Sequence, residues 1–215
     1  MVKKYLSEFI GTFLLTSCVV GSGIMAENLS NGNLALALLA NTIATGAILF
    51  VIIKMFSQIS GAHFNPIVSF TFFLRRELEK NDFVYYVAIQ IISALLAIIL
   101  THYLFDLSLF QISKNHRGEL NMLVSEAIAT FGLVLTILLV RENDETSVAL
   151  SVALYIMAGY WFTPSTSFAN PAVLIGRVFT NTFTGIAPSS FLFFLLGQLL
   201  GALLSLLIYK SLNRS

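Results

Sequence analysis

The chain alternates between long apolar stretches and short polar connectors. Most of its charged residues lie in the connectors, among them ENLSNGN, RRELEKND, DLSLFQISKNHRGE and RENDE. A helix needs about 20 mostly apolar residues to cross the hydrocarbon core of a bilayer. Six stretches approach or exceed that length, at residues 5–26, 34–56, 83–105, 121–140, 146–163 and 188–209. The pattern predicts an all-α membrane protein with six transmembrane helices.

Two further apolar segments, 66–74 and 171–180, are too short to cross a bilayer. Each begins at an Asn-Pro step, Asn65–Pro66 and Asn170–Pro171. Proline fits the first turn of a helix, because its missing N–H would have no partner there. Polar, non-helical backbone precedes each segment, and such backbone is tolerated at membrane depth only where protein buries it or water lines it. We therefore expect two re-entrant half-helices.

The two halves of the chain repeat one another. Three motifs recur in the same order: SEFIGTF (7–13) as SEAIATF (125–131), FNPIV (64–68) as ANPAV (169–173), and QIISA (90–94) as QLLGA (198–202). An odd number of spans separates the copies, so the repeats are inverted and their related elements meet near the midplane. We expect a single domain over 1–215, with repeat one at about 1–105 and repeat two at about 121–215.

Composition excludes several other classes of protein. Hydrophobic residues make up 57% of the chain and charged residues only 11%, against roughly 25% charged in soluble domains. A net charge of +1 gives no reason to expect a nucleic-acid partner. The single cysteine, Cys18, provides neither a disulfide framework nor a Cys-rich metal site. We expect no metal and no cofactor. The N-terminal lysines and apolar run resemble a signal peptide, but the run is longer than usual and favours a retained first span.

Basic residues predict the orientation in the membrane. With a cytoplasmic N-terminus, nine fall inside and three outside, as the positive-inside rule requires. The inner set is Lys3, Lys4, Lys54, Arg75, Arg76, Lys80, Arg141, Lys210 and Arg214, and the outer set is Lys114, Arg117 and Arg177. We expect a multi-pass protein of the plasma or inner membrane with both termini in the cytoplasm.

The paired Asn-Pro steps suggest a channel. If both half-helices begin at the midplane, Asn65 and Asn170 place amide donors where the two halves meet, and the approach segments offer carbonyl acceptors. Each half-helix also brings the positive end of its dipole to that point. Two such ends repel cations and protons while neutral, hydrogen-bonding solutes pass.

These motifs resemble the aquaporin, or major intrinsic protein, family over essentially the whole length. The residues that carry the resemblance are SEFIGTF, SGAHFNPIV, the span with Gln90, SEAIATF and NPAV. The resemblance implies an aquaporin-like fold and a homotetramer in which each subunit has its own pore. The second box, Asn170-Pro171-Ala172, follows the family pattern. The first departs from it, because Ile67 replaces the usual alanine, and the larger side chain is expected to narrow or dry the midplane.

The same resemblance locates an outer selectivity filter. Counting from the boxes gives Thr45, Ala158, Ser167 and Val173, with Phe168 as the neighbour to consider, and Val173 stands where the family usually has arginine. These side chains are small, which favours a wider opening for larger neutral solutes. Arg177 follows Val173 by one turn on the same helix face. It either replaces the missing charge from the outer vestibule or simply pairs with loop carbonyls or headgroups.

A bacterial subgroup of the family also has valine at this position, and some of its members accompany arsenic-resistance genes. The resemblance thus implies water, glycerol-like polyols and neutral metalloid hydroxides such as arsenous acid as permeants.

Three polar residues have two interpretations each. Glu8 and Glu126 occupy equivalent positions in the repeats, and an acid within a span is a candidate functional site. They relay protons, or they brace the re-entrant segments as in the family. His63 gates the cytoplasmic mouth by titration or is a fixed loop histidine bonded to one of these acids. The aromatic residues 160–162 are expected at the membrane interface.

A secondary transporter is the alternative to a channel, since it too uses inverted repeats and broken helices. It would need a coupling site, for which Glu8 or Glu126 is the candidate. An enzyme is not expected, because the chain has none of the hydrolase or metalloprotease motifs.

Overall fold

The computed structural model describes residues 2–213, and all regular secondary structure within that range is helical, with no strand. The elements are α1 (Val2–Leu29), α2 (Leu34–Ser60), α3 (Pro66–Leu74), α4 (Lys80–Leu104), α5 (Leu120–Asn143), the 3₁₀ helix η1 (Glu145–Ser147), α6 (Val148–Phe162), α7 (Pro171–Val178) and α8 (Pro188–Leu212). Arg214, one of the basic residues assigned to the cytoplasmic side, lies outside the described residues.

Five of the eight α-helices in the described range are long and apolar enough to cross a membrane: α1, α2, α4, α5 and α8. The fifth expected span, 146–163, differs. Its first residues form η1, and the helix α6 that follows has 15 residues, or about 22 Å of rise. Asp144 starts η1, because its side chain accepts a hydrogen bond from the Thr146 N–H, and the acidic connector therefore shortens the helix.

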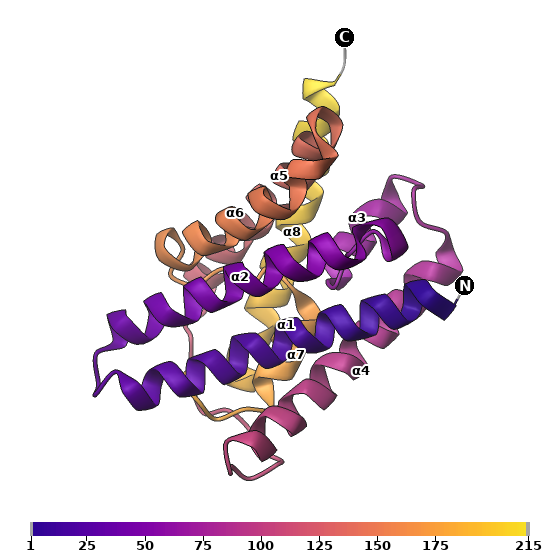
Figure 1. Ribbon diagram of the computed structural model, residues 1–215. Helices are drawn as coiled ribbons and strands as arrows, with labels where there is room; N and C mark the ends of the chain where they lie inside the picture. Colours follow the sequence, from indigo (N-terminus) through magenta and orange to yellow (C-terminus); the bar gives the residue numbers. More distant parts are fainter. Residues whose placement is uncertain (1, 214–215) are drawn as a thin grey trace.

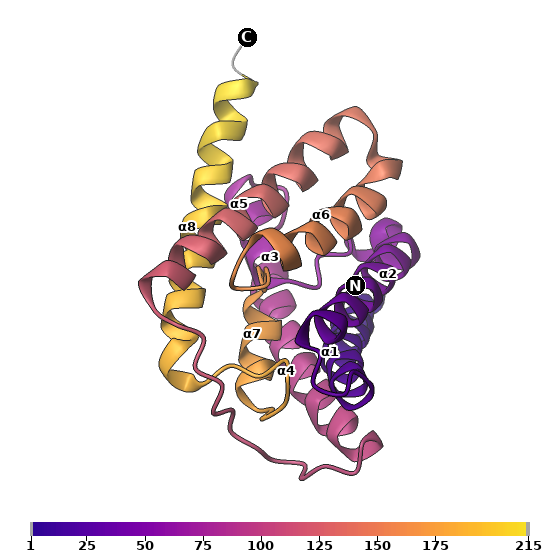
Figure 2. The ribbon, with the colours of Figure 1, turned by 90° about the vertical axis from the view of Figure 1, so that its left-hand side faces the viewer.

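The long helices surround the two short ones (Figures 1 and 2). Helix α1 packs against α2 and α4, α5 packs against α8, and α2 meets α6 across the two halves. The segment 105–119, which connects the halves, runs along one end of the molecule from α4 to α5 (Figure 2). Many large apolar side chains on the long helices are exposed, including Leu36, Ile43, Leu96, Ile128, Leu200 and Leu207. An apolar outer surface suits a protein solvated by lipid.

Both half-helices start as expected. In α3 the Asn65 side chain accepts a hydrogen bond from the Ile67 N–H, and in α7 Asn170 accepts from the Ala172 and Val173 N–H groups. Proline follows each asparagine at the first helical position. The helices contain 9 and 8 residues. Each is therefore at most about 14 Å long, which is enough to cross about half of the hydrocarbon core. Helix α3 has the expected bounds, whereas α7 ends at Val178 rather than 180.

Candidate functional site

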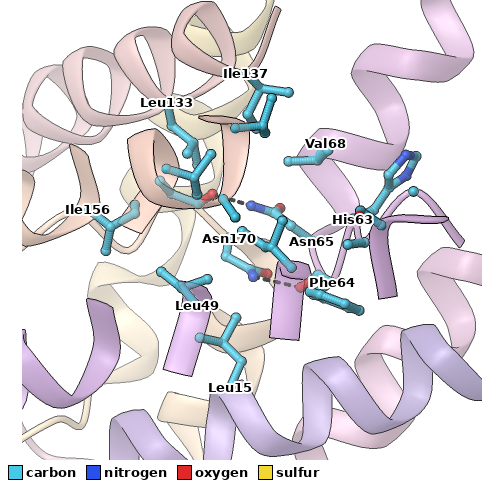
Figure 3. A pocket seen from close by; sticks show the side chains of 18 of the residues that line it. Leu15, Leu49, His63, Phe64, Asn65, Val68, Leu133, Ile137, Ile156 and Asn170 are labelled. Atoms are coloured by element: carbon cyan, nitrogen blue, oxygen red, sulfur yellow. Dashed lines mark hydrogen bonds between the residues drawn. The ribbon is translucent and has the colours of Figure 1, made fainter. Parts of the chain in front are cut away.

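The two Asn-Pro steps contact each other through reciprocal hydrogen bonds. The Asn65 Nδ2 group donates to the carbonyl oxygen of Ala169 at 2.7 Å, and the Asn170 Nδ2 group donates to that of Phe64 at 2.9 Å. Figure 3 shows both bonds between the facing half-helix starts. An amide group has two N–H donors. Each asparagine therefore uses one to join the halves, and both side chains also line the cavity described below.

The approach segments adopt an unusual backbone conformation. Phe64 and Ala169, each directly before its asparagine, have φ of 48° and 46°. Ala62 and Ser167, two residues earlier in each segment, also have positive φ. L-residues pay roughly 1–2 kcal/mol for this left-handed region, so the surrounding structure must hold the segments in place.

The two buried glutamates hold these segments. Glu8 accepts hydrogen bonds from the N–H groups of His63 and Phe64 at 2.9 and 2.7 Å. Glu126 accepts from Phe168 and Ala169, both at 2.9 Å. Both acids have 0% exposure. The backbone contacts are those of a brace, one in each half.

Other side chains complete each brace. Gln90 donates to Glu8 at 2.8 Å, and Gln198 donates to Glu126 at 2.7 Å. His63 is bonded to Glu8 through its backbone, while its ring lies within 3.1 Å of the Ser69 hydroxyl and stacks on Phe72.

A cavity of about 800 Å³ runs past the joined half-helix starts, and Asn65 and Asn170 both line it. Around Asn65 and Asn170 its wall is apolar, formed by Leu15, Leu49, Val68, Leu133, Ile137 and Ile156 (Figure 3). Toward one end it reaches Lys54, Glu77, Arg141 and Glu145, and toward the other Thr45, Tyr160 and Arg177. An apolar tube with a few amide donors and carbonyl acceptors offers little to replace the hydration shell of an ion.

Three of the four expected filter residues line this cavity: Thr45, Ser167 and Val173. Ala158 does not, since it is exposed on α6. Tyr160 lines the cavity instead, 4% exposed, with its hydroxyl 3.1 Å from the Thr45 hydroxyl. Ala158 was expected by counting residues back from Asn170. That count passes through residues 163–169, where the backbone is irregular and helical register is lost.

Tyr160 also corrects the expected aromatic belt, because only its neighbours Trp161 and Phe162 are exposed, at 51% and 53%. The sequence signal that could have identified Tyr160 is a hydroxyl-bearing aromatic residue one turn from Ile156, both on one face of α6.

The Ile67 side chain does not narrow the passage at the midplane, contrary to what the sequence led us to expect. Its side chain packs with Val134, Ala202 and Leu206 of α5 and α8, and it is 2% exposed. The cavity wall is formed by the next residue, Val68. The third residue of the box therefore points away from the passage, and its larger size fills the core.

An ion-pair cluster lies at the cavity end that contains Glu77. Glu77 accepts from the Arg75 Nε at 2.5 Å and from Arg141 at 2.6 Å, which joins the loop after α3 to α5. Partial burial opposes ionisation of Glu77, but the hydrogen bonds from Arg141 and Arg75 outweigh it and lower its pKa below the ordinary value. Lys54 donates to the Thr146 carbonyl nearby.

Fold and site together define a class: a helical membrane protein whose cavity runs past the junction of two half-helices joined at their amino ends. The family model described as Major intrinsic protein matches residues 1–209. The chain belongs to this family, whose members form membrane channels.

Known proteins agree with this assignment. An aquaglyceroporin, AqpS, from Rhizobium meliloti (strain 1021) is 46% identical over 98% of this chain and 90% of its own length. Aquaporin TIP1-2 from Zea mays is 28% identical over 96% of this chain and 84% of its own. The X-ray structure of the aquaglyceroporin from Plasmodium falciparum matches with a TM-score of 0.79 over 99% of this chain and 97% of that one. At 22% identity the last likeness shows the aquaporin fold alone.

Proposed function

We propose that the chain is a passive channel for water and small uncharged solutes, namely glycerol-like polyols and neutral metalloid hydroxides such as arsenous acid. The observation that carries the proposal is the cavity lined by both Asn65 and Asn170, at the point where the amino ends of the two half-helices meet. Small side chains at Thr45, Ser167 and Val173 support permeants larger than water. The name aquaglyceroporin, borne by the relative at 46% identity, agrees with a polyol permeant.

Bracing by Glu8 and Glu126 supports a channel over a coupled transporter. Each carboxylate already accepts hydrogen bonds from two backbone N–H groups and a glutamine. Protonation would weaken every one of these bonds, since the charged form is the better acceptor. A coupling acid must change protonation during transport, and these acids hold the pore backbone instead.

Assembly and orientation complete the proposal. The subunit is a single domain of two inverted repeats, it forms a homotetramer with one pore per subunit, and both termini face the cytoplasm of a plasma or inner-membrane protein. The exposed apolar faces of the long helices support burial in lipid and against neighbouring subunits.

Solute flux into proteoliposomes tests the channel. We expect glycerol and arsenous acid to enter faster than in empty liposomes, driven by their own gradients. Proton and sodium gradients should leave the flux unchanged. Flux that requires either gradient would establish the transporter alternative.

A filter variant tests the permeant class. Val173 lines the cavity and is 4% exposed, so Val173→Arg adds bulk and charge there. Stopped-flow measurements should show a larger fractional loss for glycerol than for water. Equal losses, or none, would mean that Val173 does not line the constriction.

A further inference from the structure

Arg177 is a buried cation at the outer end of the cavity. It lies in the last turn of α7, is 3% exposed and lines the passage. The ion pairs among residues 2–213 are Lys4–Asp82, Arg75–Glu77 and Arg141–Glu77, so Arg177 has no carboxylate partner there. A buried charge is costly unless other groups compensate it.

Two neutral groups and a helix end provide that compensation. The Arg177 Nε group donates to the Thr184 carbonyl oxygen, and the guanidinium carbon lies 3.3 Å from the centroid of the Phe168 ring. A cation over an aromatic face is stabilised by the ring quadrupole, and a cation in the last turn of a helix is stabilised by the dipole. The site thus holds the guanidinium in place and leaves its positive charge unneutralised.

The free donors of Arg177 are available to the passage. Among the described residues, only the Nε group of Arg177 has a hydrogen-bond acceptor. Its two terminal amino groups have none there, and they are not fully buried. Tyr160 and Thr45 contribute hydroxyl groups to the same end of the cavity. Arg177 lies four positions after Val173 on α7, about 6 Å of rise toward the outside.

We propose that Arg177 supplies the positive charge of the outer pore from one turn beyond Val173, where it repels cationic solutes and donates hydrogen bonds to the oxygen atoms of neutral ones. The inference rests on the proposed channel function and assigns its charge selectivity to a residue. A positive charge beside a narrow, poorly hydrated passage acts strongly on a permeating ion.

Arg117 provides a matched control. It contacts the same loop, donating to the carbonyl oxygens of Gly185 at 2.8 Å and Phe183 at 3.0 Å, and it lies 5.4 Å from the centroid of the same Phe168 ring. Arg117 is absent from the cavity wall. If Arg177 merely held the loop, neutralising either arginine would have the same effect on selectivity.

Urea and guanidinium have nearly the same planar shape and differ in charge, so the ratio of their fluxes reports charge at constant size. We would measure both at low concentration in proteoliposomes containing the full chain, the Arg177→Gln variant or the Arg117→Gln variant. The wild-type protein should pass urea and exclude guanidinium. Arg177→Gln should raise guanidinium flux relative to urea roughly tenfold, and Arg117→Gln should leave the ratio unchanged.

An unchanged ratio in Arg177→Gln, or the same change in both variants, would overturn the assignment. If Arg177→Gln does not fold, Arg177→Lys decides the matter. The lysine ammonium keeps the positive charge but lacks the planar guanidinium with its several N–H donors. The lysine variant should therefore still exclude guanidinium. Admission of guanidinium by the lysine variant would contradict the proposal. Absence of urea, glycerol and water flux in the wild-type protein would refute the channel function itself, which is a separate outcome.

Discussion

At the scale of single residues, Glu8 and Glu126 maintain the backbone that forms the pore. The residues they bind include Phe64 and Ala169, whose positive φ would otherwise relax toward the ordinary region. Hydrogen bonds from N–H groups to a carboxylate are stronger than neutral ones. The buried carboxyl group of each brace therefore stabilises a conformation that L-residues rarely adopt.

Replacing one brace tests this function. Glu126→Gln keeps the size of the side chain but leaves one oxygen acceptor, so one of the Phe168 and Ala169 N–H groups loses its partner. An unsatisfied buried donor costs about 1–3 kcal/mol. We expect a lower unfolding temperature in detergent and slower water flux.

Glu119→Gln is the matched control, because the side chain of Glu119 is exposed and caps nothing. Indistinguishable unfolding temperatures for the two variants would show that Glu126 is not a brace.

Much of the residue-level site follows from sequence. Asn65 and Asn170 are recognisable because proline fixes the start of each half-helix, and Val173 follows within the same helix. Helical register is lost in the irregular segment before Asn170. Thr166, Ser167 and Ala169 all have positive φ, and no periodicity in the sequence indicates how such a segment turns. Counting residues back from Asn170 therefore led to Ala158, whereas Tyr160 lines the cavity.

At the scale of elements, close contact between α5 and α8 depends on glycine. A Cβ at Gly201 would overlap the carbonyl oxygen of Ala127 and lie 2.8 Å from the Phe131 nitrogen, and Gly197 similarly faces the backbone of α5. Small residues allow helices in membranes to approach closely, where packing rather than the hydrophobic effect holds them together.

Gly201→Ala should force these helices apart. Although alanine favours a helix by about 1 kcal/mol, overlap with backbone cannot be relieved by a rotamer change, and overpacking costs about 1–3 kcal/mol. We expect a net loss of thermal stability. Gly21→Ala is the control, because the nearest atoms to its Cβ would belong to side chains, those of Phe105 at 3.3 Å and Thr101 at 3.6 Å. If Gly201→Ala matched or exceeded the stability of Gly21→Ala, the close contact would not matter.

Element boundaries were predictable to within a few residues where caps or apolar length define them. The start of α3 and α7 follows from Asn-Pro, and the long spans follow from composition. The short α6 was not anticipated, because the apolar pattern does not reveal that Asp144 caps a separate 3₁₀ turn.

At the scale of the whole molecule, Glu77 connects the two halves at the end of the cavity near Lys54. It binds Arg75 in its own loop and Arg141 at the end of α5, and Arg141 also lies over the Phe72 ring. The depressed pKa of Glu77 means that its ionised form is favoured by folding. Its contribution to stability is therefore present above the unfolded-state pKa, about 4.3, and is lost as pH falls through the lower folded-state value.

The expected result is a loss of stability below about pH 4.3 that is smaller in Glu77→Gln than in the wild-type protein. Thermal unfolding in detergent over a pH series measures it. The same pH dependence in both proteins would exclude Glu77 as a titrating link between the halves.

The central claim concerns the junction of the half-helices, where Asn65 and Asn170 join the repeats and two amino ends oppose cations. Water and proton fluxes measured in the same proteoliposomes, with the membrane potential clamped, test it most directly. We predict osmotic water flux well above that of empty liposomes, with proton flux no higher than theirs. Proton flux that rises together with water flux would contradict the account.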